Sequence, residues 1–172
     1  MTAELRPSRS TDLTRIEALY RAAFPQEDLV PLVRRLLAEA PDMLSLIVEI
    51  EDEIVGHVAF TPCRVADHKE KVALLGPLAV HPAHQKTGLG RRLVEDGFSR
   101  LAEAGFAMVL VLGDPGYYGR FGFAEERQIM TPCPIPDAWR AAWQSVALES
   151  AQTSLQGALE VPPMWREPTL WS

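Results

Sequence analysis

Residues 78–91 read LAVHPAHQKTGLGR, a short run in which apolar residues give way to glycines and basic residues. The run ends a stretch over residues 72–80 whose apolar composition predicts a strand. It leads into residues 91–104, where apolar side chains recur at helical spacing. Glycine lets a backbone turn sharply, and the first N–H groups of a helix have no internal partners. The sequence therefore predicts an anion site suited to phosphate where this helix begins.

A second interpretation of these residues needs no ligand. Short glycine patterns are weak evidence by themselves, and a glycine-bearing turn before a surface helix has the same appearance. The run does not end in the Gly-Lys-Ser/Thr of a Walker A loop, and its glycines are not spaced as in the dinucleotide fingerprint GxGxxG. The pattern also fits a binder of some other phosphate ligand that uses only the loop before Arg91.

The chain on either side of this run shows helical and strand patterns in alternation. Before it, the sequence predicts a strand near Leu5, helices over residues 13–23 and 28–40, and strands over residues 44–51 and 54–65. After it, the sequence predicts a strand over residues 107–112, helical turns over residues 117–121, and an extended segment from Phe123. Pro77 falls inside the strand predicted over residues 72–80. Because proline cannot donate to a sheet ladder, we expect a break in pairing at Gly76-Pro77.

The composition changes after Met130, where six of the fourteen prolines and all four tryptophans lie. Asp137 is placed to cap a helix that carries Trp139, Trp143 and Val146, and a strand is predicted over residues 155–161. We therefore expect a core over residues 1–130 and a C-terminal segment over residues 131–172, a helix plus a strand, packed on the same domain.

The overall composition limits the function classes. The chain has 172 residues and a net charge of -6, which suits one domain and disfavours nonspecific nucleic-acid binding. Cys63 and Cys133 have neither disulfide-framework nor metal-site spacing, so we expect reduced thiols and no metal. No apolar leader and no apolar run of about 20 residues is present, which favours a cytoplasmic protein without membrane contact.

Two motifs together resemble those of the GNAT superfamily of N-acetyltransferases. The first is Leu78-Ala79-Val80-His81-Pro82 followed by Gln85-x-x-Gly88-x-Gly90, and the second is residues 117–123, YYGRFGF. The resemblance covers roughly residues 5–123 by the order of elements, and its specific part covers residues 74–123. It implies an α/β fold with a mixed, mostly antiparallel central sheet, a splayed and bulged strand, and helices on both faces.

The resemblance also implies the activity and the donor. The expected function is transfer of the acetyl group of acetyl-CoA, bound as a cosubstrate, directly to a primary amine of a small molecule or a protein. The alternative is a noncatalytic regulatory protein that binds acyl-CoA on the same fold. Leu78, Ala79 and Val80 would line the thioester end. The pyrophosphate would be held by Gln85, Lys86, Thr87, Gly88, Leu89, Gly90 and Arg91.

Two catalytic roles follow from the resemblance and the residue chemistry. Tyr118 matches the family's tyrosine, four residues before Gly122, and would be the general acid for the CoA sulfur. Many family members carry a glutamate on the strand that corresponds to residues 72–80, but this strand has no carboxylate. His57 is a weak candidate for the base because imidazole titrates near neutral pH, and water relays or capture of free amine stay open.

The tryptophans allow two interpretations. They line an amine pocket, where indole attracts an ammonium group, or they pack in the core or at a homodimer contact. Helix-spaced aromatic residues such as Trp139 and Trp143 favour packing.

Overall fold

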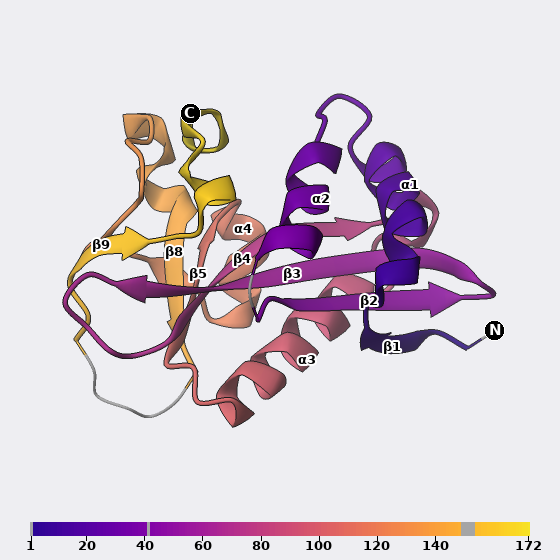
Figure 1. Cartoon of the computed structure of the whole chain (residues 1–172), viewed down its shortest axis with the longest axis horizontal. Coiled ribbons are helices and arrows are strands. Elements are labelled where there is room, and N and C mark those ends of the chain that lie inside the picture. The colour runs from indigo at the N-terminus through magenta and orange to yellow at the C-terminus, as the bar shows by residue number, and fades with distance from the viewer. Residues whose placement is uncertain (1, 41, 149–153) are drawn as a thin grey trace. The chain divides into compact units, whose positions relative to one another are not determined.

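The computed structural model describes residues 2–40, 42–148 and 154–172 (Figure 1). Its α-helices are α1 (Leu13–Ala23), α2 (Val30–Glu39), α3 (Leu89–Glu103) and α4 (Pro115–Tyr118). Its strands are β1 (Glu4–Pro7), β2 (Leu44–Ile50), β3 (Glu53–Val65), β4 (Val72–Val80), β5 (Met108–Leu112), β6 (Ala124–Glu125), β7 (Ile129–Met130), β8 (Trp143–Ala147) and β9 (Gly157–Glu160).

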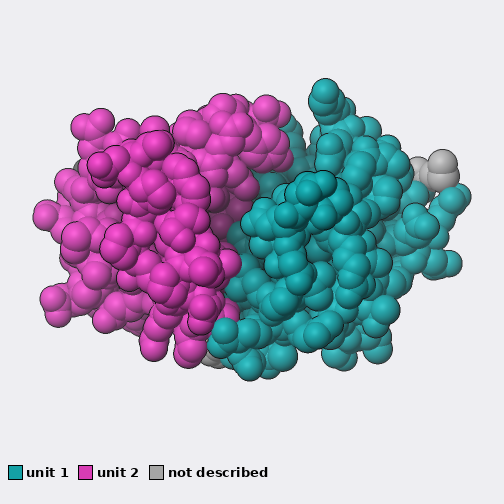
Figure 2. Space-filling model, turned by 90° about the horizontal axis from the view of Figure 1, so that it is seen from above, with its two compact units in different colours: residues 1–61, 76–97 teal, residues 62–75, 98–172 magenta. Residues whose placement is uncertain are grey.

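The chain forms two compact units, which Figure 2 colours separately. The first contains residues 1–61 and 76–97, and the second contains residues 62–75 and 98–172. Strands β3 and β4 and helix α3 each continue from one unit into the other. Residues 131–172 belong to the second unit, together with earlier parts of the chain.

In the first unit, helices cover both faces of a sheet. Strand β1 pairs antiparallel with β2, and β2 pairs antiparallel with β3. Helices α1 and α2 bury their apolar stripes in one cluster with Ile47 of β2 and Ile54 of β3. The first half of α3 packs on β3 instead, with Gly97 next to Phe60. Figure 1 shows α1 and α2 on one side of these strands and α3 on the other, which agrees with the helices expected on both faces.

The second unit contains the later strands. Strand β5 pairs parallel with β4 and antiparallel with β8, and β8 pairs antiparallel with β6. The end of β3 pairs antiparallel with β9, which pairs parallel with β7. Most of the pairings in the two units are antiparallel, which confirms the predicted mixed, mostly antiparallel class.

Pairing between β4 and β5 stops early. The register runs from Val72 opposite Met108 to Leu74 opposite Leu110, although β5 continues to Leu112. The Gly76-Pro77 peptide bond is cis, and Gly76 has a φ of 145°. The register confirms the break in pairing that the proline predicts: the last residue of β4 paired with β5 is Leu74, two residues before Gly76.

The helix predicted from Asp137 is wrong beyond Ala142. A 3-10 helix covers Asp137–Ala142, and the chain then continues as strand β8 from Trp143 to Ala147. All five residues of β8 pair with β5. The edge of β5 offers a row of backbone donors and acceptors. The hydrogen bonds that β8 makes with them stabilise the strand more than the helical spacing of three side chains stabilises a helix.

We expect Gly97→Ala to destabilise the protein. A β-carbon at Gly97 would lie 2.2 Å from Phe60 Cε2, and Phe60 is completely buried. Alanine favours a helix over glycine by about 1 kcal/mol, but forcing atoms into a packed core costs about 1–3 kcal/mol. Denaturant unfolding should therefore show a lower free energy of unfolding. Ser99→Ala, an exposed position two residues later in α3, is the control. A Gly97→Ala variant as stable as the parent would contradict the close packing.

Candidate active site

The glycine-bearing run forms an exposed turn at the start of α3. Gly88 has a φ of 88°, a conformation that favours glycine, and no heavy atom lies within 4 Å of where its β-carbon would be. The Arg92 N–H donates to Gly88 O at 3.1 Å, so regular helical bonding begins there. Leu89 and Gly90 are buried beneath the turn, whereas the residues before them are exposed. The start of α3 is thus open to a ligand.

Side chains within the run fix its shape. Gln85 Nε2 donates to Val80 O at 3.1 Å, and the Thr87 hydroxyl donates to His84 O. The Ala83 N–H donates to His81 Nδ1 at 3.1 Å, so the His81 side chain helps to shape the turn. Because Gln85 is engaged with the end of β4, its side chain organises the run.

Basic residues add positive charge around this turn. Lys86 is exposed and has a φ of 63°. Arg91 is also exposed, and its guanidinium lies 3.7 Å from the Glu95 carboxylate one turn later. An exposed ion pair of this kind is weak. The geometry suits a phosphate group at the helix start.

The end of β4 presents its residues in two ways. Leu78 and Val80 are partly exposed. Ala79 is 1% exposed, and its side chain belongs to the apolar cluster with Ile47. Of the three residues predicted to line the thioester, Ala79 therefore offers its backbone groups rather than its side chain.

Tyr118 is the last residue of α4, in the second unit. Its ring centroid lies 5.7 Å from that of Phe123 and 5.0 Å from that of Tyr117, edge to face in both cases. Burial raises the pKa of Tyr118 above that of an ordinary tyrosine, and Tyr117 raises it further. No hydrogen bond to its hydroxyl comes from the residues that the structure describes. The phenol is therefore protonated at neutral pH.

His57 lies on β3 in the first unit, with both ring nitrogens hydrogen-bonded. Nδ1 lies 2.7 Å from the Tyr20 hydroxyl, and Nε2 lies 2.8 Å from the Ser45 hydroxyl. The residue is 1% exposed, and burial lowers the pKa of His57 to about 3. The imidazole is therefore neutral at physiological pH. Sequence reasoning missed Tyr20 and Ser45, because their role depends on a contact between distant segments.

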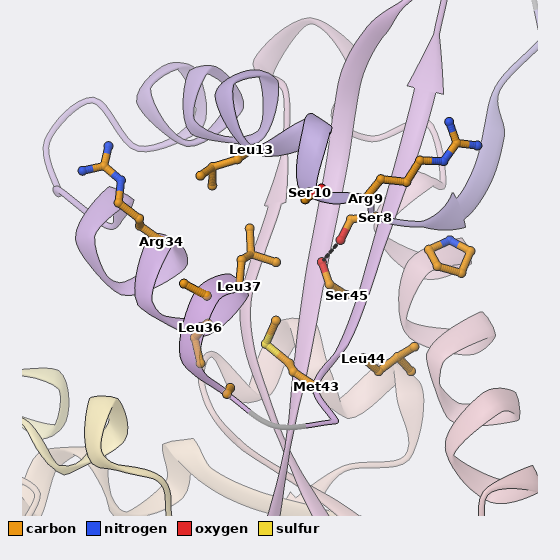
Figure 3. Close-up of a pocket in the computed structure, with 13 residues that line it drawn as sticks. Ser8, Arg9, Ser10, Leu13, Arg34, Leu36, Leu37, Met43, Leu44 and Ser45 are labelled. Carbon is orange, nitrogen blue, oxygen red and sulfur yellow. Dashed lines mark hydrogen bonds between the residues drawn. The ribbon is translucent and has the colours of Figure 1, made fainter.

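A cavity of about 430 Å³ lies beside this network in the first unit (Figure 3). Ser8 donates a hydrogen bond to Ser45 at 2.7 Å in its wall, and Leu37 and Met43 provide apolar surface. Ser45 lies in this wall and is also hydrogen-bonded to His57 Nε2 at 2.8 Å. None of the residues predicted from the motifs lines this cavity.

Within the described ranges, no group of three or more His, Cys, Asp or Glu side chains is placed to hold a metal ion. None of the helices that the structure describes is both long enough and apolar enough to cross a bilayer.

Known proteins share both the sequence and the fold. The acetyltransferase (GNAT) family matches residues 13–123. The uncharacterized N-acetyltransferase YjhQ of Escherichia coli K12 is 33% identical over 154 residues, which cover 86% of this chain and 85% of that protein. The uncharacterized N-acetyltransferase YhbS of the same strain is 37% identical over 113 residues, which cover 65% of this chain and 68% of that protein.

Solved structures give the same result. The crystal structure of YhbS from Escherichia coli in complex with CoA aligns with a TM-score of 0.85 and 31% identity, over 96% of this chain and 92% of that chain. A GNAT family acetyltransferase from Brucella melitensis in complex with acetyl-CoA aligns with a TM-score of 0.76 and 29% identity, over 95% and 97% of the two chains. The chain belongs to the GNAT family of acetyltransferases.

Proposed function

We propose that the protein transfers the acetyl group of acetyl-CoA directly to a primary amine of a small molecule or a protein. The observation that carries the proposal is the open glycine turn at the start of α3, with Gly88 at a positive φ and Lys86 and Arg91 beside it. Such a turn fits a pyrophosphate. The related proteins from Escherichia coli and Brucella melitensis were solved with CoA and acetyl-CoA, which supports the same donor here.

In this proposal Tyr118 protonates the sulfur of CoA as the thioester breaks. The amine nitrogen attacks the carbonyl carbon, the C–S bond breaks, and the phenol proton goes to the departing thiolate. The Tyr118 phenol is protonated at neutral pH, as an ordinary tyrosine is, so it has a proton to give; burial raises the pKa of Tyr118, which keeps it protonated and makes it a weaker acid than an exposed tyrosine.

The amine must also lose a proton. The end of β4 carries no carboxylate, and the buried His57 has neither ring nitrogen free. These observations favour capture of amine that is already neutral, or a relay through water, over abstraction by His57. His57 as a base stays a prediction, and His57→Gln with a wild-type dependence of kcat on pH would exclude it.

Thiol release from acetyl-CoA over a panel of amines tests the function. The panel includes polyamines, aminoglycosides, amino acids and a peptide with a free N-terminus. Acetyl-CoA-dependent thiol release with one amine class, with the acetylated amine found by mass spectrometry, is the expected result. Tight acetyl-CoA binding without transfer to any amine would instead favour the noncatalytic regulatory alternative.

Gly88→Val should strongly weaken acetyl-CoA binding, by about tenfold or more if even one phosphate contact of about 1.5–3 kcal/mol is lost. The free protein has open space there, so the loss comes from the positive φ and from obstruction of the ligand. Gly105→Val is the matched control, because Gly105 has a φ of 86° at the other end of α3. Calorimetric titration should show weak binding only for Gly88→Val, while both variants lose thermal stability. Equal affinities for acetyl-CoA would place the donor elsewhere.

A further inference from the structure

Gly113 follows β5 directly and lies against the ring of Tyr118. A β-carbon at Gly113 would be 2.4 Å from Tyr118 Cε2 and 2.8 Å from Cδ2. The backbone of Gly113 does not have a positive φ, so its conformation is open to any residue. The ring of Tyr118, rather than the turn, is what requires a glycine at this position.

The backbone of Gly113 is held on both sides. Its N–H donates to Ala142 O at 2.9 Å, and its carbonyl accepts from Gln144 Nε2 at 3.1 Å. Gln144 is 1% exposed on β8, and its amide also reaches Ala142 O at 3.3 Å. If the backbone at Gly113 moved away to make room for an added methyl group, these buried hydrogen bonds would break.

The ring of Tyr118 is held from its other sides. Its centroid lies 5.7 Å from that of Phe123 and 6.4 Å from that of Phe121. Its backbone N–H donates to Asp114 O at 2.9 Å, and the Asp114 side chain accepts from the Gly116 N–H at 2.9 Å to begin α4. The position of the hydroxyl is thus defined by the strand end, the helix start and the aromatic cluster together.

We propose that Gly113 and Gln144 are positioning residues for Tyr118. Because Gly113 has no side chain, the ring of Tyr118 can lie against its backbone. Gln144 fixes the position of that backbone by donating a hydrogen bond to the Gly113 carbonyl. The inference rests on the proposed acid role of Tyr118, because a proton donor must reach the sulfur within about 3 Å. A displacement of about 1 Å is enough to cost about a hundredfold in rate.

Gly113→Ala tests the inference with a change of one methyl group. We expect kcat to fall by roughly ten- to a hundredfold, with acetyl-CoA affinity within about twofold of wild type. Gly119→Ala is the matched control, because it lies in the same segment with a φ of -56° and open space around its β-carbon. Its kcat should stay at the wild-type value. A Gly113→Ala enzyme with full kcat would overturn the proposal.

The double variant Gly113→Ala/Tyr118→Phe separates positioning from general damage. If Gly113 acts through the Tyr118 hydroxyl, the methyl group lowers kcat no further once the hydroxyl is gone. If the loss of kcat in the double variant were instead the product of the losses in the two single variants, the proposal would be overturned. Gln144→Met supplies a second variant if Gly113→Ala folds poorly, since it removes the amide and keeps a similar volume. We expect a fall in kcat that likewise disappears in the Tyr118→Phe background.

A spectroscopic readout keeps this inference distinct from the proposed function. The chain has three tyrosines, so ¹³C-labelled tyrosine gives few ring signals, and Tyr118→Phe assigns one of them. Gly113→Ala should shift the Tyr118 signals and leave those of Tyr20 in place. If Tyr118→Phe retains full turnover, the acid role fails even when this shift is seen. If the Tyr118 signals do not move, the positioning inference fails even when Tyr118 is the acid.

Discussion

Tyr118→Phe should lower kcat by about 10²–10⁴-fold, the usual contribution of a positioned acid. The change removes one hydroxyl and keeps the ring, so the packing against Phe123 and the space above Gly113 are retained. Acetyl-CoA affinity should move far less, since the proton is needed only as the C–S bond breaks. Steady-state rates with the best amine from the panel, together with calorimetric affinity for acetyl-CoA, measure both quantities.

Tyr117→Phe is the internal control for this result. The guanidinium of Arg120 lies 4.7 Å from the centre of the Tyr117 ring, a contact that phenylalanine preserves. We therefore expect a mild effect. Full turnover in Tyr118→Phe with loss of turnover in Tyr117→Phe would show that the family's tyrosine corresponds to Tyr117, one residue earlier in the motif. Full turnover in both variants would mean that thiolate leaves without a tyrosine, even if acetyl-CoA binds as proposed.

Removal of the chain after Met130 should abolish cooperative folding. Strand β8 pairs with all five residues of β5, and its loss exposes a strand in which Val109 and Leu110 are completely buried. Trp143 and Trp171 are at most 1% exposed, with ring centroids 5.7 Å apart. Uncovering so much apolar surface promotes aggregation. Denaturant unfolding and gel filtration of the shortened chain would measure the effect.

Single tryptophan changes supply the control for that experiment. Trp171→Ala should cost about 3–5 kcal/mol of unfolding free energy, as loss of a large buried side chain does, whereas Trp139→Ala should cost little because Trp139 is 38% exposed. A soluble, cooperatively folding chain of residues 1–130 with normal acetyl-CoA binding would show that the C-terminal segment is an appendage.

Local patterns were sufficient for most of the fold over residues 4–123. Alternation, apolar periodicity and the proline in β4 predict the strands, the helices and the early end of the β4–β5 pairing, because each depends on neighbours in sequence. The segment from Trp143 shows the limit. Its side chains fit a helix, and only the free edge of β5, more than thirty residues earlier, makes it a strand.

The candidate site divides in the same way. The glycine turn at Gly88 and the tyrosine at position 118 belong to short motifs and were predicted. The role of Gly113 could not be predicted, because nothing in the sequence shows that the ring of Tyr118 folds back onto it. His57 has two hydrogen-bond partners, Tyr20 and Ser45, which also come from segments that meet only in the folded chain.

Strands β3 and β4 and helix α3 each begin in one unit and end in the other, and this limits how the gene can recombine with a related gene. The unit boundaries fall between Thr61 and Pro62, between Leu75 and Gly76, and between Gly97 and Phe98. Each lies inside a strand or a helix, not in a loop. Because the two units alternate along the chain, a single crossover between two related genes cannot exchange one unit intact. Chimeras joined at all three boundaries would combine two parents within a strand or a helix each time. Shuffled libraries should instead place their crossovers in loops such as residues 66–71, and accept units of mixed parentage.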